Sequence, residues 1–417
     1  MSRRYQNRAI LTLTLVCMYC LWWLGGTIIA GYMFLKERSK IALLFLFLLF
    51  GVFGYILNVP HYVDMDLMRL YNAYDNIKEY SFSEALPLIL SVGDFSYSLF
   101  WVLGQLDIPT RFIGFLSSAW FYGAWFIVIL LIENKQTTKM SFNFLFAITL
   151  IFLTVTHPFF FSGVRSATGT MLSVIGSVKL MQSDCRKGWW WLLSACFFHF
   201  SFLIYLLFCI LFKLVRNHFF KVTSIILLAG APIYFFLIDF LFDYLSSFGI
   251  LGEVLSGKIY AYNVSDEHQR SNLILTYGSG FRFIDNVFIF LLCTIYRYIP
   301  AYRAKIKSNG ELYNFDKFLT LFFCSCVFIS PNAVMLGRYI NLLIYLNLAF
   351  LAYTYYYLPK PFLSKLVNAI AIVSLFLSII AVYRESIGLD AIYYIYYPRV
   401  LYEGWFSLSN IYIDYVK

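Results

Sequence analysis

Residues 41–57 read IALLFLFLLFGVFGYIL, an apolar run without a charged side chain. The run lacks the polar and apolar alternation of an outer-membrane β-strand, and its length suits a membrane-spanning helix. The whole chain shares this character, since 61% of its 417 residues are hydrophobic, 13% are charged and the mean hydropathy is +0.73. These values exclude a water-soluble globule, and we expect one all-α integral membrane domain over residues 1–417.

The apolar residues fill about 10–12 transmembrane helices at about 20 residues per span. Hydropathy places ten spans near 10–35, 41–57, 112–132, 142–160, 163–182, 221–242, 283–300, 316–331, 334–357 and 364–383. The first run is longer than a signal-peptide core and is expected to be retained. Residues 189–215 form either one long span or two half-helices that meet as a hairpin near His199.

Basic residues set the expected orientation. If residues 189–215 form the hairpin, six basic clusters share one side, which the positive-inside rule assigns to the cytoplasm. They are Lys36, Arg38 and Lys40; Lys135 and Lys139; Lys179, Arg186 and Lys187; Lys213, Arg216 and Lys221; Arg297, Arg303, Lys305 and Lys307; and Lys360 and Lys365. The loops 58–111 and 243–282 and the tail 384–417 then face the periplasm. This topology places Arg3, Arg4 and Arg8 outside, against the usual rule for a first helix.

The net charge of +10 follows largely from this pattern and does not call for a nucleic-acid partner. The eight cysteines lie almost wholly within apolar runs, so we expect neither a disulfide framework nor a metal site.

Two arginines lie where a membrane protein tolerates charge poorly. Arg165 begins an apolar helix, at a cost of at least about 2.5 kcal/mol if it is central and unpaired. It shares a helical face with three small residues, Gly169, Ser173 and Gly176, which lets a neighbouring helix approach closely. Arg338 shares a face with Asn341 and Tyr345. Two such guanidinium groups suit a diphosphate. The alternatives are a snorkelling Arg165 and an Arg338 paired with a structural carboxylate.

Further candidates flank these arginines. His199, at the expected hairpin tip, is either a hydrogen-bonded core residue or a phosphate donor and proton shuttle. In the loop 58–111, Asp66 and Arg69 share a helical face. They form a solvated ion pair, or Asp66 acts as a general base, a role for which Asp64 is the alternative. Tyr71 and Tyr74 in this loop, and Tyr260 and Tyr262 in the loop 243–282, are candidates for stacking on glycan rings. Arg282, at the end of the second loop, is expected to reach a phosphate.

Four stretches stand out in order between residues 60 and 350. They are DMDLMRLYNAY (64–74) with GDFSYSLFWVLGQL (93–106), FSGVRSATGTMLSVIGSVKL (161–180), ACFFHFSFLIYLL (195–207) and GRYINLLIYL (337–346). In combination they resemble the Wzy-type O-antigen or polysaccharide polymerases, in particular the EpsG-like branch. The family's arginine before the histidine hairpin falls on Arg165, its histidine on His199, its late arginine on Arg338 and its loop carboxylate on Asp66 or Asp64.

The resemblance implies a GT-C-like glycosyltransferase of the bacterial inner membrane. It joins undecaprenyl-diphosphate-linked repeat units on the periplasmic side, with no metal or other cofactor, and it works with membrane lipid and a chain-length regulator protein. The chain has Asp94 where the family has glutamate and lacks the usual glycine-rich approach, which favours an O-antigen enzyme. An O-antigen ligase, a lipid-linked oligosaccharide flippase and a multispan acyltransferase are the alternatives.

Overall fold

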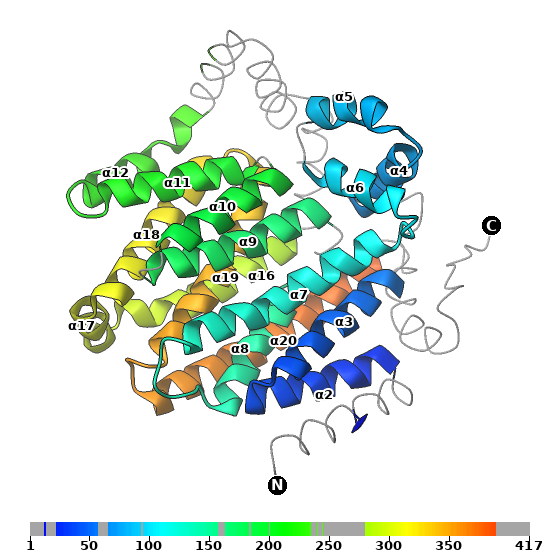
Figure 1. Ribbon diagram of the computed structural model, residues 1–417. Coiled ribbons are helices and arrows are strands. Elements are labelled where there is room, and N and C mark those ends of the chain that lie inside the picture. Colours follow the sequence, from blue (N-terminus) through cyan, green and yellow to red (C-terminus); the bar gives the residue numbers. More distant parts are fainter. Residues whose placement is uncertain are drawn as a thin grey trace.

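The computed structural model describes residues 12–13, 22–56, 66–92, 95–156, 163–182, 185–199, 201–234, 240, 244 and 280–388. These residues form helices and turns without a strand (Figure 1). Four described helices are long and apolar enough to cross a membrane, or five crossings if the pair bent by 77° before Pro300 counts as one. The described part of the chain is that of an all-α, multi-pass membrane protein, whereas a total of 10–12 spans stays a prediction.

Each of the ten predicted spans overlaps a described helix. The first part of the chain forms α2 (Trp22–Glu37), α3 (Lys40–Ile56), α4 (Asp66–Ile77), α5 (Phe82–Val92), α6 (Phe95–Gln105), α7 (Phe112–Glu133), α8 (Phe142–Val155) and α9 (Val164–Met181). The rest forms α10 (Cys185–Phe198), α11 (Ser201–Val215), α12 (Phe220–Ala229), η2 (Ala231–Ile233), α16 (Gly280–Ile295), η4 (Tyr296–Tyr298), α17 (Pro300–Ser308), α18 (Gly310–Ile329), α19 (Ala333–Thr354) and α20 (Lys360–Gly388).

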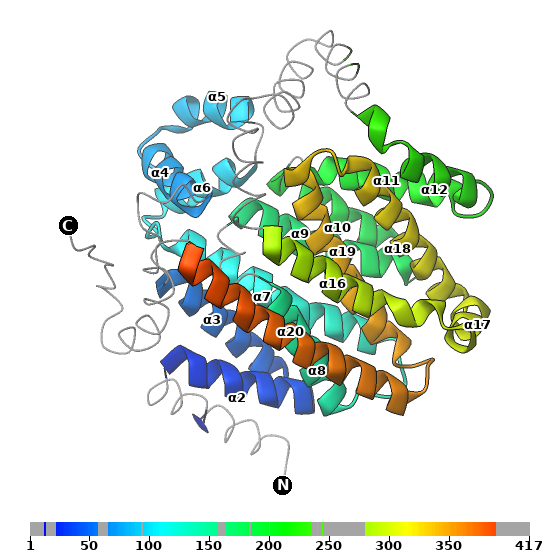
Figure 2. The ribbon, with the colours of Figure 1, turned by 180° about the vertical axis from the view of Figure 1, so that it is seen from behind.

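The long helices run back and forth between two ends of one bundle. We call the end that carries α4–α6, the start of α7 and the start of α9 the α6 end, and the end that carries α17 and the α7–α8 turn the α17 end (Figures 1 and 2). The six basic clusters lie at the α17 end, where α2, α9 and α11 finish with Lys36, Lys179 and Lys213 in their last turns.

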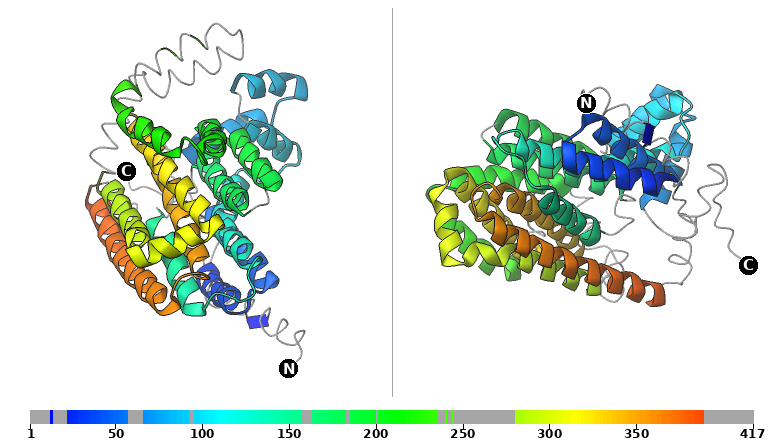
Figure 3. Two further views of the ribbon diagram at one scale, coloured as in Figure 1. Left: turned by 90° about the vertical axis from the view of Figure 1, so that its left-hand side faces the viewer. Right: turned by 90° about the horizontal axis from the view of Figure 1, so that it is seen from below.

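The α10–α11 segment resolves the alternative left open for residues 189–215. The chain forms two helices of 14 and 15 residues rather than one long span. They lie side by side in every view, with the turn between them at the α6 end (Figures 1, 2 and 3). Each helix is shorter than the roughly 20 residues of a full span. The hairpin is therefore correct, and it returns the chain to the α17 end.

The short helices α4–α6 form a separate layer over the α6 end. In α4 and α5 the hydrophobic residues follow a helical period on one face, as expected of helices that lie along an interface. The Tyr74 hydroxyl donates to the Ile108 carbonyl, and the Trp101 indole donates to the Tyr80 carbonyl at 3.0 Å. The first bond ties α4 to the loop before α7, and the second ties α6 to the turn between α4 and α5.

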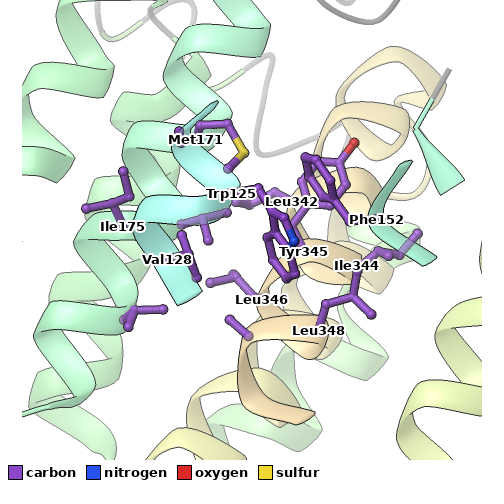
Figure 4. Packing of buried hydrophobic residues seen from close by; sticks show 14 of the residues in the cluster. Trp125, Val128, Phe152, Met171, Ile175, Leu342, Ile344, Tyr345, Leu346 and Leu348 are labelled. Carbon is purple, nitrogen blue, oxygen red and sulfur yellow. The ribbon is translucent and has the colours of Figure 1, made fainter. Parts of the chain in front are cut away.

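The bundle core is aromatic. Trp125 of α7 stacks on Phe152 of α8, with ring centroids 4.7 Å apart, and Phe152 in turn contacts Tyr345 of α19 (Figure 4). Met171 and Ile175 of α9 close the same cluster (Figure 4). Large rings packed in this way bury much apolar area and fix the relative positions of α7, α8, α9 and α19.

Buried ion pairs reinforce the α17 end. Arg297 Nε lies 2.7 Å from Asp316 Oδ1, and both side chains are at most 2% exposed. Arg297 also donates to Asn347 of α19 at 3.3 Å, and Arg303 pairs with the second oxygen of Asp316. A second pair joins Arg38, after α2, to Glu133 at the end of α7. The Arg38–Glu133 pair joins residues 95 positions apart, whereas the Asp316 pairs join neighbouring elements of the chain.

Candidate functional site

Arg165 is the second residue of α9, in the first turn at the α6 end. Its side chain is half-buried and its Nε atom is fully buried. One turn further along, Gly169 lies against the Phe202 ring of α11 so closely that a Cβ atom would not fit. At Gly176 a Cβ would lie 2.9 Å from Leu192 of α10. The small-residue face predicted for α9 is thus confirmed as the surface on which the α10–α11 hairpin packs.

His199 occupies the tip of that hairpin and is 5% exposed. Its Nδ1 accepts hydrogen bonds from the Ser201 backbone N–H at 3.1 Å and lies 2.8 Å from the Ser201 hydroxyl. A backbone amide can only donate, so Nδ1 acts as the acceptor and the neutral ring carries its proton on Nε2. The ring therefore stabilises the turn between α10 and α11 and presents an N–H donor at its other nitrogen.

Arg338 reaches the same region from α19. The helix begins at Ala333, and the side chain of the preceding N-cap residue, Asn332, accepts from the Met335 backbone N–H at 2.9 Å. Tyr339, next to Arg338, donates from its hydroxyl to the Ser201 carbonyl at 2.5 Å. This bond ties the arginine-bearing turn of α19 to the His199 tip. Arg338 itself is half-buried, with one terminal nitrogen fully buried.

The predicted face of α19 continues below Arg338 with polar contacts. Asn341 accepts from Asn286 of α16 at 3.3 Å, and the Tyr345 hydroxyl lies 3.0 Å from the Thr156 hydroxyl after α8. Asp285, beside Asn286, is half-buried and has one fully buried carboxylate oxygen. It brings a carboxylate onto the helix pair that holds Arg338.

The loop residues have different outcomes. Tyr71 and Tyr74 are 7% and 1% exposed, because α4 packs against the start of α7, where a Cβ on Gly114 would lie 2.7 Å from the Tyr71 hydroxyl. Burial raises the pKa of Tyr71, which keeps the phenol neutral. This corrects the expectation that these two rings stack on glycan, since neither offers an open face. Arg69 is exposed on α4.

Other predicted residues are described only partly. Asp66 begins α4 and Arg282 lies in the first turn of α16, both at the α6 end, and their side chains lie outside the described residues. Asp64, Asp94, Tyr260 and Tyr262 lie outside the described residues altogether.

Three residues that belong to the site were missed by sequence reasoning: Ser201, Tyr339 and Asp285. Asp285 offered a signal, because an acidic residue within an apolar span is costly and lies one helical turn after Arg282. Ser201 and Tyr339 offered none, since serine and tyrosine are common in membrane helices.

The assembled site places two arginines, a histidine N–H and a carboxylate-bearing helix at one end of the bundle. A set of this kind is chemically able to bind a di-anionic group and to orient a hydroxyl nearby. Within the described ranges, no three His, Cys, Asp or Glu side chains gather as metal ligands would. Comparison of the chain with protein-family models, with curated proteins and with solved structures finds no match.

Proposed function

We propose that this protein is an O-antigen or related surface-polysaccharide polymerase. It joins undecaprenyl-diphosphate-linked repeat units and requires neither metal nor nucleotide. The observation that carries the proposal is the link between Tyr339 and Ser201, together with the contact of Gly169 with Phe202. These two contacts hold the turns bearing Arg338 and Arg165 against the tip bearing His199. Two cations and a donor from three separate segments thus meet at one end, as a diphosphate requires.

The proposed reaction is a single displacement. The acceptor hydroxyl oxygen attacks the anomeric carbon of the donor, a new glycosidic C–O bond forms, and the bond to the diphosphate oxygen breaks with its electron pair. The arginines and His199 Nε2–H stabilise the charge that develops on the diphosphate. A carboxylate, assigned here to Asp66, takes the proton of the acceptor hydroxyl. The product has inverted configuration at the anomeric carbon.

In this proposal the α6 end faces the periplasm and the α17 end faces the cytoplasm. Support comes from the basic clusters at the α17 end, which the positive-inside rule assigns to the cytoplasmic side. The α4–α6 layer then lies at the periplasmic surface of the inner membrane, close to the lipid-linked donor and acceptor. A chain-length regulator protein is the partner that this activity implies.

The function is tested with purified protein in lipid nanodiscs and synthetic lipid-diphosphate-linked repeat units. We expect a ladder of lipid-linked products, each one repeat longer than the last, with or without EDTA. Transfer onto a lipid A-core acceptor without a ladder would identify a ligase instead. Protein-dependent movement of the lipid between leaflets without any new glycosidic bond would identify a flippase.

The same assay separates the roles of Asp66 and His199. We expect Asp66→Asn to remove turnover and leave lipid-diphosphate binding nearly intact, because the carboxylate serves the acceptor. His199→Gln keeps a hydrogen-bond donor and should retain partial turnover, since Nδ1 is already occupied by Ser201. Asp285→Asn tests the second carboxylate at the site, and Asp75→Asn, an exposed carboxylate on the same helix as Asp66, is the matched control that should remain active. Normal turnover in Asp66→Asn with an inactive His199→Gln would make the histidine the base, and loss only in Asp285→Asn would move that role to α16.

A further inference from the structure

A cavity of about 400 Å³ lies between α6, α7, α9 and α10. Its walls are mainly apolar, with Leu103 from α6, Leu116 and Trp120 from α7, and Thr168 and Leu172 from α9 among the lining residues. Its volume is within the range of small-molecule and cofactor sites. A helix bundle that needed only to pack would fill this space, because protein interiors are close-packed.

The cavity begins beside the candidate site. Val164 and Phe198 line it, and they directly precede Arg165 and His199 in the chain. From there it follows α9 inward as far as Leu172, which is eight residues or about 12 Å along a helix. Helix α6 contributes the wall on the side of the α4–α6 layer. The space is therefore a mainly apolar slot, one end of which lies at the turns that carry Arg165 and His199.

Trp120 forms part of the apolar wall of the slot. Its ring lines the cavity and stacks on Trp191 of α10, with ring centroids 6.1 Å apart. The indole nitrogen is fully buried and makes no hydrogen bond to a described residue. The slot thus offers an aromatic ring against which an apolar chain can pack.

We propose that the cavity holds the first isoprene units of a polyprenyl diphosphate whose diphosphate lies at Arg165. This inference rests on the proposed function and names the lipid part of its donor site. Charge and shape select the occupant, because the ligand must join an apolar chain directly to an anionic head. The volume accommodates only the beginning of a long chain, and the remainder extends into the bilayer. The chain thereby fixes the depth of the diphosphate relative to Arg165 and Arg338.

The test measures equilibrium binding to the full-length protein in nanodiscs, without turnover. The probes are farnesyl diphosphate, a saturated alkyl diphosphate of equal length and inorganic pyrophosphate. Thr168→Phe on α9 and Ser194→Phe on α10 each fill part of the cavity, and Thr223→Phe, half-exposed on α12, is the matched control for an added ring. Thermal unfolding in the same nanodiscs confirms that each variant is folded.

We expect the two filled variants to weaken farnesyl diphosphate binding by about tenfold or more and to leave pyrophosphate binding unchanged. Arg165→Ala should weaken both. Unchanged farnesyl diphosphate binding in folded, filled variants would refute the proposed cavity site. In another outcome, the wild-type protein binds the saturated alkyl diphosphate and farnesyl diphosphate with equal affinity, and the filled variants lose affinity for both equally. That result would identify a general lipid-chain site and overturn the isoprenoid assignment. The binding experiment does not depend on turnover. Normal binding together with no product ladder would therefore contradict the proposed polymerase activity and leave the cavity site standing.

Discussion

We expect Arg165→Ala and Arg338→Ala each to lower product-ladder formation by about 10²–10³-fold, the loss typical when one preorganised donor to a developing anion is removed. The expectation follows from the arrangement at the α6 end, where contacts of Gly169 and Tyr339 with the α10–α11 hairpin hold the two arginine-bearing turns. In the proposed function each guanidinium group donates two parallel hydrogen bonds to phosphate oxygens in a site with little water, where such bonds are strongest. Rates are measured with purified variants and synthetic lipid-linked repeats.

Lysine at either position should restore little activity, because an ammonium group is a point charge and cannot reproduce the planar fork. Arg186→Ala is the matched control, since Arg186 is exposed at the start of α10 and lies at the α17 end of the same hairpin. It should retain normal rates. Full recovery of long products in the lysine variants would show that bidentate diphosphate binding is not what these residues provide.

The largest effect on stability is expected at Asp316. This carboxylate pairs with Arg297 at 2.7 Å, with both side chains at most 2% exposed, and it also pairs with Arg303. Asp316→Asn removes the charge with little change in volume and leaves the Arg297 guanidinium buried without its counter-ion. Breaking a buried pair in this way costs about 3–5 kcal/mol. Unfolding in detergent, followed by intrinsic fluorescence, should report a correspondingly large decrease in midpoint temperature.

Two controls show whether burial causes that loss. Asp75 pairs with Lys78 at 2.8 Å, but their side chains are 47% and 38% exposed, so Asp75→Asn should cost about 0–1 kcal/mol. Burial opposes ionisation of Asp75, yet hydrogen bonds from Lys78 and Thr110 hold its pKa below the ordinary value, so this small contribution disappears as the pH falls through that pKa. Replacing Arg297 by Met together with Asp316 by Leu should recover most of the lost stability. Equal destabilisation by Asp316→Asn and Asp75→Asn would contradict this account.

The sequence by itself determined the helices of this protein. Every backbone N–H and C=O group in an apolar membrane interior needs a partner within its own segment, so a run such as residues 41–57 has few conformations open to it other than a helix. The sequence also identified Arg165, His199 and Arg338 as candidate site residues, because charged and titratable groups in apolar runs are costly and must be accommodated.

The tertiary structure decided what these helices place together. Hydropathy did not distinguish one long span from a hairpin over residues 189–215. The interruption of the helix at His199 and the packing of Phe202 on Gly169 establish the hairpin. Likewise α4 buried Tyr71 against the start of α7. Helix formation depends on hydrogen bonds four residues apart, which a local pattern predicts. The bond from the Tyr339 hydroxyl to the Ser201 carbonyl joins residues 138 positions apart, and such a contact exists only when the packing of whole helices brings that side chain to that backbone group.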